Sequence, residues 1–443
     1  RLKKAIASGA DPASYNDIGW TCLQAAALCC EPGAVRALLS NLHGACDGPT
    51  LTQEQARENK ARAERVLYAT SRSGLTALLW AHWMVWVCDQ PPLDAADAAA
   101  IEREAHTRKR ASEIVTLLAS RGAAMRKRDE LALKALRTAY LNGSAADKSL
   151  LRLDPAQLKV LGMAADGNSS AKDGFASRMG EIRNLKGHQK YAFYEANYTP
   201  STHDGRPLSL EAFLLEMGES HKFGTKDGKL FAPNFHDSMP MLVISSKLFV
   251  QDRVASGMAE APEAIFALHV YTLYTSIFQD ANYAMRSSDL PGIQAWQPFI
   301  YHLTQALDSL NARSEVVFRG LKLRDFTGKH PGRHVTELFI DGALFAKPGE
   351  EDKLAKYHPG NIVRWPSFSS TTRDFTIAME YGTSNLKPEE SAVILKIHTQ
   401  TVKPIRDYSY FVYEEELLYR SNATFRVTGF RQATSFNLRQ GVK

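Results

Sequence analysis

The stretch Val412-Tyr413-Glu414-Glu415-Glu416-Leu417-Leu418 places three carboxylates directly before a pair of leucines. Along a strand, side chains alternate between two faces, so Glu414 and Glu416 would share one face and Glu415 would point to the other. The two carboxylates on the shared face, about 7 Å apart along the strand, could act on one substrate. An acidic edge strand that discourages pairing with other chains is the alternative, and this stretch alone does not decide between the two.

Length and composition indicate a globular protein of more than one domain. The 443 residues exceed an ordinary domain, and 44% apolar with 23% charged residues is typical of a globular chain. Net charge is +6, but the basic residues are dispersed, and the densest clusters (108–110 and 126–128) lie on helix-like sequence. A solvated helix face explains these clusters better than nucleic-acid binding. No run of about 18 apolar residues predicts a membrane span.

The cysteines and histidines predict neither a disulfide framework nor a metal site. The five cysteines lie in the first fifth of the chain without a CxxC pair, and the thirteen histidines lack metal-ligand spacing. The cysteines are Cys22, Cys29, Cys30, Cys46 and Cys88. Reduced thiols are typical of the cytoplasm, so we expect an intracellular protein. Secretion stays open, because a targeting segment could precede Arg1.

Residues 1–142 are predicted to form helical pairs with a weak internal repeat. Each copy has a Gly-x-Thr-x-Leu turn, an Ala-rich helix and a second apolar helix. The copies comprise 19–26 with 35–39, and 74–81 with 114–118 and the turn at 122–123. They resemble ankyrin repeats, although polar insertions at 44–65 and 88–108 stretch the period of about 33 residues. The resemblance implies a solenoid that binds a protein partner. A generic helical domain is the alternative.

The remainder divides into a linker and a second domain. Residues 143–200 are expected to be a linker, because 143–176 are rich in Gly, Ala, Ser, Asp and Asn. The second domain spans 201–435. Within it, helical spacing of apolar residues predicts one amphipathic helix over 262–286 and another around 299–307.

Two histidines, His269 and His302, lie on the apolar faces of these predicted helices. Packing or hydrogen bonding explains them better than metal binding. After Leu310 the hydrophobic period changes from that of a helix to that of a strand.

Three predicted strands follow, and the first two end in unusual residues. Arg319 and Gly320 lie within the first strand, 315–321. Burial of a guanidinium is costly unless it meets an anion, and a glycine beside it would let a ligand come close. A structural salt bridge is the alternative for this arginine.

The second predicted strand, 360–372, ends in Ser369-Ser370-Thr371-Thr372 after an aromatic residue. Such hydroxyls can orient a carboxylate and a sugar, or they can cap the helix expected at 374–381. The third strand, 392–397, precedes the acidic stretch.

The sequence resembles the arginine-specific mono-ADP-ribosyltransferases, the R-S-E class, in the order of three motifs. These are Arg319, then Phe368-Ser369-Ser370-Thr371-Thr372, then Glu414-Glu415-Glu416. The resemblance extends over about 235–430 and includes Tyr271-Thr272 and Gln297-Pro298-Phe299. It implies an α+β fold in which two packed β-sheets, flanked by helices, hold NAD in the cleft between them. The chain lacks a Gly-x-Gly-x-x-Gly loop, which argues against a Rossmann fold but not against NAD.

The resemblance implies a role for each matching residue. Arg319, with Gly320 beside it, would hold the NAD phosphates, because a planar guanidinium gives pyrophosphate two parallel hydrogen bonds. Ser370 would position the catalytic Glu416. Thr371 matches the middle residue of the family's Ser-Thr-Ser and would also contact NAD. Thr372 departs from the final Ser of that motif but keeps the hydroxyl.

The acceptor side of the site is assigned to Glu414 and Phe411. Glu414 would bind the acceptor guanidinium and help to remove its proton, because a protonated arginine is a poor nucleophile. Relatives that modify other side chains often carry Gln at this position, so Glu414 favours arginine as the acceptor. Phe411 lies where relatives carry an aromatic that contacts the target protein. A packed loop aromatic is the alternative.

The predicted function is transfer of ADP-ribose from NAD to an arginine of a protein acceptor, with release of nicotinamide and without a metal. Cleavage of the nicotinamide–ribose bond builds positive charge on the sugar, which the carboxylate of Glu416 would stabilise. The alternatives are an NAD glycohydrolase and an ankyrin-type interaction protein with an inactive transferase domain. A preference for NAD over NADP stays open.

Overall fold

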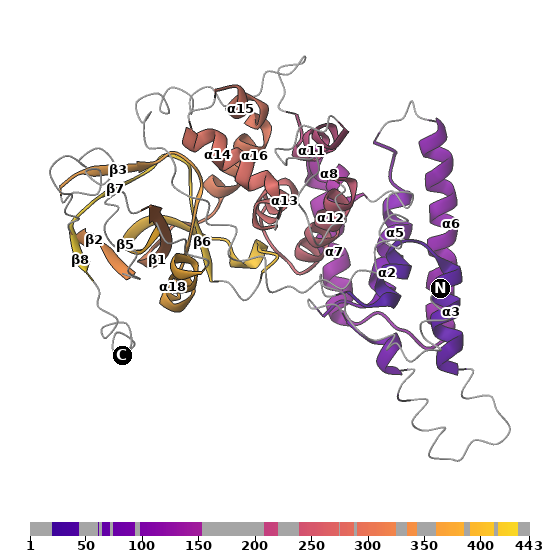
Figure 1. Ribbon diagram of the computed structural model, residues 1–443. Coiled ribbons are helices and arrows are strands. Elements are labelled where there is room, and N and C mark those ends of the chain that lie inside the picture. The colour runs from indigo at the N-terminus through magenta and orange to yellow at the C-terminus, as the bar shows by residue number, and fades with distance from the viewer. Residues whose placement is uncertain are drawn as a thin grey trace. The chain divides into compact units, whose positions relative to one another are not determined.

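The structure is a computed structural model with two compact units (Figure 1). One unit contains Arg1–Asp166 and Pro240–Phe266, and the other contains Gly167–Met239 and Ala267–Lys443. The described residues are 20–43, 61, 64–70, 74–93, 98–152, 208–219, 239–273, 275–287, 290–324, 335–342, 360–384, 390–411 and 415–432.

Helices build the first unit. They are α2 (Cys22–Leu28), α3 (Pro32–His43), α5 (Ala77–Cys88), α6 (Ala98–Ser120), α7 (Lys127–Asn142), α8 (Ala145–Leu151) and α12 (Met239–Ala255), most of which lies here. Thr21 and Thr76 cap α2 and α5, each hydroxyl accepting a hydrogen bond from the backbone three residues on. The two copies predicted from sequence therefore share one local design. Their identity as ankyrin repeats stays a prediction.

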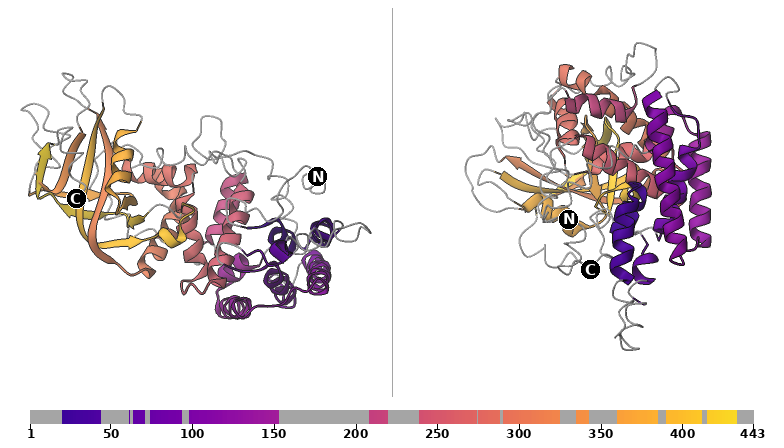
Figure 2. Two further views of the ribbon diagram at one scale, coloured as in Figure 1. Left: turned by 90° about the horizontal axis from the view of Figure 1, so that it is seen from below. Right: turned by 90° about the vertical axis from the view of Figure 1, so that its right-hand side faces the viewer.

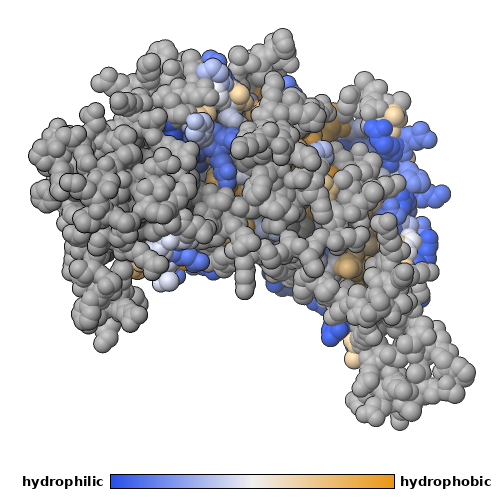
Figure 3. Space-filling view, in the orientation of Figure 1, coloured by the Kyte–Doolittle hydropathy of each residue, from blue (hydrophilic) through white to orange (hydrophobic). Residues whose placement is uncertain are grey.

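Helix α5 forms the buried centre of this unit. Trp80 and Trp83 are fully buried on it, as expected for a helix that is apolar on all sides. Helix α6 instead exposes a hydrophilic face that carries Arg108 and Lys109 (Figure 3). The first basic cluster thus lies on a solvated helix face.

The beginning of the predicted linker is helical. Ser144 caps α8, and the buried Asp147 accepts a hydrogen bond from the backbone N–H of Glu263 at 3.0 Å. Residues 153–200 lie outside the described residues.

The second unit begins with helices packed beside the strands (Figure 2). They are α11 (Leu210–Glu219), α13 (Pro262–Thr272), which starts in the first unit, α14 (Ser276–Ser287), α15 (Leu290–Ala295) and α16 (Gln297–Ser309). Helix α16 confirms the second predicted helix. The single helix predicted over 262–286 is wrong, because the chain breaks after Thr272 and restarts as α14. Thr275 caps this restart by accepting a hydrogen bond from the N–H of Ile277.

Both histidines singled out in the sequence make hydrogen bonds to the backbone. His269 Nδ1 lies 3.1 Å from the carbonyl oxygen of Tyr408, and His302 Nε2 lies 2.7 Å from that of Leu208. The prediction that they serve packing and hydrogen bonding is confirmed.

The described strands form two sheets. They are β1 (Arg313–Arg324), β2 (Val335–Gly342), β3 (Ile362–Trp365), β4 (Ser369–Thr372), β5 (Glu390–Pro404), β6 (Glu416–Tyr419), β7 (Ala423–Arg426) and β8 (Gly429–Gln432). Strands β1-β4-β6-β5-β2-β8 make a six-stranded sheet in which β1 also pairs with β5, whereas β3 and β7 make a two-stranded sheet. Helix α18 (Phe375–Thr383) lies against β1 and β5 (Figure 1).

The single strand predicted over 360–372 is wrong. The chain forms β3 up to Trp365, bends at Pro366-Ser367, and resumes as β4 in the other sheet. Proline removes a backbone donor, which favours a strand end at this point. The two sheets share one core, in which Trp365 packs edge-on against Tyr419 of β6, with ring centroids 5.8 Å apart. Their arrangement around an NAD cleft stays a prediction.

Candidate functional site

Arg319 lies on β1 and is only 6% exposed. Its Nη1 donates a hydrogen bond to the carbonyl oxygen of Ser370 at 3.0 Å. The guanidinium carbon lies 4.9 Å from the ring centroid of Trp365, within reach of a cation–π interaction. A carbonyl and an aromatic ring thus orient this buried cation.

Gly320 leaves space for a helix. A Cβ at this position would lie 2.0 Å from the carbonyl oxygen of Ala378 and 2.6 Å from the backbone nitrogen of Gly382, both on α18. The missing side chain therefore allows α18 to pack directly on β1. This packing explains the glycine without a ligand, and contact of Gly320 with NAD stays a prediction.

The three hydroxyls that follow Ser369 have different partners. Ser370 Oγ lies 3.0 Å from the hydroxyl oxygen of Tyr271, and Thr371 Oγ1 donates to the carbonyl oxygen of Leu417 at 2.9 Å. Thr372 Oγ1 accepts from the N–H of Asp374 at 3.0 Å. Thr371 thus ties β4 to β6, whereas Ser370 contacts the helical layer.

The hydroxyl run does not provide the N-cap of the following helix, because Asp374 does. This residue is the N-cap of α18, and its carboxylate accepts a hydrogen bond from the N–H of Thr376 at 2.7 Å. The sidechain of Thr372 only braces the backbone at Asp374. Ser370 is therefore available for a role in the site.

Glu416 begins β6 opposite Thr372 and is 5% exposed. Its neighbour Glu415 is half-buried, and the Glu415 carboxylate receives hydrogen bonds from Arg373 and Arg406. The different burial of these two glutamates agrees with the predicted division of the acidic run between two faces, which stays a prediction. Glu414 lies outside the described residues.

Tyr271 on α13 contacts Ser370 and lies near Glu416. Burial, followed by the nearby Glu416 carboxylate, raises the pKa of Tyr271 to about 12. Hydrogen bonds with Ser370 and Asn282 and the charge of Arg319 act in the opposite direction. Tyr271 is therefore a neutral phenol at neutral pH, and it lies within electrostatic reach of both buried charges.

Phe411 packs inside the protein. It is 4% exposed, and its ring meets that of Tyr410 edge-on at 4.9 Å between centroids. Thr272 Oγ1 accepts a hydrogen bond from the N–H of Tyr410 at 3.0 Å, which ties this segment to α13. This packing agrees with the alternative of a packed loop aromatic, and contact of Phe411 with an acceptor protein stays a prediction.

The structure brings Arg319, Ser370 and Glu416 together on the adjacent strands β1, β4 and β6. Sequence reasoning assigned no role to Tyr271 or Trp365. The sequence gives Tyr271 only as part of the family resemblance, and Trp365 only as a residue of the predicted strand 360–372. Nothing local in the sequence indicates either contact, because Tyr271 is 99 residues from Ser370 in the chain.

Comparison with known proteins identifies the family that this unit resembles. Residues 249–438 match the ART family model, described as NAD:arginine ADP-ribosyltransferase. The match includes every site residue described above. It supports NAD-dependent ADP-ribosyl transfer, with NAD as the substrate of the family.

Solved structures give a further likeness. Vis toxin, an ADP-ribosyltransferase from Vibrio splendidus, is 19% identical over 39% of this chain and 68% of its own, with a TM-score of 0.26. Vis in complex with agmatine is 16% identical over 54% of this chain and 85% of its own, also with a TM-score of 0.26. No curated protein sequence matches the chain.

The part of the chain that the structure describes offers neither a metal site nor a membrane-spanning helix. There, no three His, Cys, Asp or Glu side chains are grouped so that they could hold a metal ion. No helix in these ranges has both the length and the apolarity needed to cross a membrane.

Proposed function

We propose that the chain transfers ADP-ribose from NAD to an arginine side chain of a protein acceptor and releases nicotinamide. The observation that carries the proposal is the juxtaposition of Arg319, Ser370 and Glu416 on neighbouring strands within the region that matches the ART family. NAD offers a pyrophosphate that a guanidinium can bind and a ribose whose hydroxyl can donate to a carboxylate.

The chemistry assigns separate tasks to these groups. Arg319 binds the pyrophosphate, and its contacts with the Ser370 carbonyl and the Trp365 ring preset its orientation. Glu416 accepts a hydrogen bond from the ribose and stabilises the positive charge that develops as the bond to nicotinamide breaks. Nicotinamide leaves with the electron pair of that bond, and a nitrogen of the acceptor forms the new bond to the ribose carbon.

Glu414 supports arginine as the acceptor. A guanidinium is protonated at neutral pH, because its pKa exceeds about 12, so it must lose a proton as the new bond forms. A carboxylate two residues before Glu416 can bind the guanidinium and receive that proton.

The helical unit would bind a protein partner, and we place the enzyme inside the cell. An ankyrin identity of the repeats is part of this proposal.

Labelled NAD tests the assignment, with agmatine as a small guanidinium acceptor. We expect Glu416→Ala and the isosteric Glu416→Gln to lose both NAD cleavage and transfer, by a factor of about 100 or more. Glu414→Gln should lose transfer but keep some cleavage. Glu380→Ala removes an exposed carboxylate on α18 and should behave as wild type. Equal transfer by wild type and Glu416→Ala would refute the proposal.

NAD glycohydrolase activity is the second candidate. Arg319 and Glu416 act on the bond to nicotinamide without any acceptor, so water can take the place of arginine. Release of free ADP-ribose that agmatine does not reduce, with no labelled agmatine, would favour this activity. An inactive transferase domain, the third alternative, would cleave no NAD at all.

A further inference from the structure

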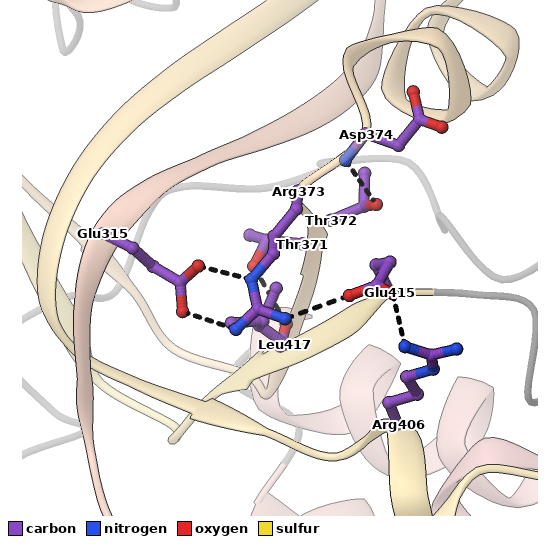
Figure 4. A network of polar contacts seen from close by, with 8 residues as sticks. All are labelled: Glu315, Thr371, Thr372, Arg373, Asp374, Arg406, Glu415 and Leu417. Atoms are coloured by element: carbon purple, nitrogen blue, oxygen red, sulfur yellow. Dashed lines mark hydrogen bonds and ion pairs between the residues drawn. The ribbon is translucent and has the colours of Figure 1, made fainter.

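A network of four charged side chains surrounds the beginning of β6 (Figure 4). Arg373 binds Glu315 of β1 through two hydrogen bonds, of 2.5 and 2.9 Å. Its third nitrogen, Nη1, donates to Glu415 at 3.0 Å. Arg406 donates to the other oxygen of Glu415 at 2.5 Å. Two cations thus balance two carboxylates, and the guanidinium of Arg373 connects β1 to the residue directly before β6.

The position of this network in the chain relates it to the catalytic carboxylate. Arg373 directly follows Thr372, and Glu415 directly precedes Glu416. Thr372 and Glu416 face each other in the β4–β6 register. The network therefore joins Arg373 and Glu415, the two residues that flank the Thr372–Glu416 pair, by a hydrogen bond between their side chains.

Global stability is a poor explanation for the network. The side chains of Arg373, Glu415 and Arg406 are 41%, 33% and 52% exposed. The pairs of Glu415 are this exposed and contribute little to the free energy of unfolding, whereas the bidentate pair with Glu315, whose side chain is 21% exposed, contributes modestly. A guanidinium with a bidentate partner does, however, fix direction, because its planar fork sets the relative placement of the groups that it binds.

We propose that Arg373 is a positioning residue for Glu416. By bridging Glu315 and Glu415, it fixes the backbone where β6 starts and so holds the Glu416 carboxylate at the place required for bond cleavage. In this role Arg373 acts through Glu415 and not by direct contact with NAD or the acceptor. The inference rests on the proposed function.

The first test compares Arg373→Ala with wild type in steady-state NAD cleavage. A misplaced catalytic group costs up to roughly 100-fold for 1 Å, so we expect kcat to fall about tenfold while KM for NAD stays within about twofold. The unfolding midpoint should fall by no more than about 4 °C, because one partly exposed bidentate pair is lost. Arg420→Ala is the matched control, because Arg420 follows the other end of β6, pairs with Asp308 at 3.3 Å and is 46% exposed. It should keep the wild-type kcat.

Conservative and double variants test the bridge itself. Arg373→Lys keeps the charge but loses the planar fork, so we expect kcat to stay at least about threefold low. A wild-type kcat in Arg373→Lys would overturn the inference that Arg373 acts by bridging Glu315 and Glu415. Arg373→Ala combined with Glu415→Ala should lose clearly less than the product of the two single losses, because both changes remove the Arg373–Glu415 contact. Multiplication of the two losses would overturn the link through Glu415.

The wild-type measurement separates this inference from the function on which it rests. Without NAD cleavage by the wild type, the proposed function fails and the inference fails with it. If the wild type cleaves NAD and Arg373→Ala has an unchanged kcat, the inference alone fails. A parallel rise of KM with an unchanged kcat would also overturn it, because that pattern indicates lost NAD binding rather than misplaced catalysis.

Discussion

Substitution of Gly320 by alanine should force α18 away from β1. The new Cβ would lie 2.0 Å from the Ala378 carbonyl oxygen, whereas Cβ contacts under 3.0 Å essentially never occur, so the helix backbone must retreat by the difference of about 1 Å. The nearest atoms are backbone, and no side chain can rotate out of the way. Overpacking of this kind costs about 1 to 3 kcal/mol. For a domain of this size, the loss lowers the unfolding midpoint by about 2 to 12 °C.

Thermal unfolding followed by circular dichroism measures this change. The matched control is Gly33→Ala on α3, where nothing lies within 4 Å of the added Cβ. Because alanine is the better helix former, the midpoint of the control should stay unchanged or rise slightly.

The result that would refute the reasoning is a Gly320→Ala midpoint within about 1 °C of wild type. An unchanged midpoint together with a raised KM for NAD would mean that the glycine makes room for the ligand. Loss of stability with a nearly normal KM in the folded fraction would mean that it makes room for α18. The two explanations for Gly320 are therefore separable by experiment.

Three further substitutions test the contacts of the site. Tyr271→Phe removes the hydroxyl that meets Ser370 at 3.0 Å, so we expect a loss of about 1 to 2 kcal/mol in urea unfolding and a lower kcat for NAD cleavage. Trp365→Leu removes the ring beneath Arg319; a cation–π contact of about 0.5 to 2 kcal/mol predicts a KM for NAD raised between about two- and thirtyfold, as initial rates would show. The hydrogen bonds from its arginine partner lower the pKa of Glu315, so its ion pair stabilises the fold above the ordinary carboxyl pKa and is lost as pH falls through the lowered value. In Glu315→Gln the free energy of unfolding should therefore fall less steeply as the pH is lowered below the ordinary carboxyl pKa. An unchanged slope in that pH range would contradict this.

The sequence predicts the elements that carry the site because its signals there are local. Arg319 in an apolar run, the hydroxyls at 369–372 and the glutamates before Leu417 each break a strand pattern at one point. Their order along the chain matches one family, and the structure places Arg319, Ser370 and Glu416 on adjoining strands. The helix that begins after Asp374 was also predictable, because its cap is a sequence signal.

Two predicted elements contain breaks, and only one of these breaks has a signal in the sequence. Apolar residues keep a helical spacing through 262–286, yet the chain breaks after Thr272, where that hydroxyl binds both the carbonyl oxygen of His269 and the N–H of Tyr410. The second partner lies on a distant segment, so the break depends on tertiary structure. Pro366, in contrast, was visible, and its missing donor could have divided 360–372 into two strands.

The acidic run shows how identical residues acquire different tasks from their surroundings. Glu415 and Glu416 are adjacent and chemically equal, but strand alternation directs them apart. Two arginines neutralise Glu415 at the half-exposed side, whereas Glu416 is buried near the phenol of Tyr271. Without its arginines, Glu415 would add an uncompensated negative charge that could attract the acceptor guanidinium away from the reaction. In the proposed function, the network therefore has two roles: it positions the Glu416 carboxylate, and its two arginines keep Glu415 from competing for the acceptor.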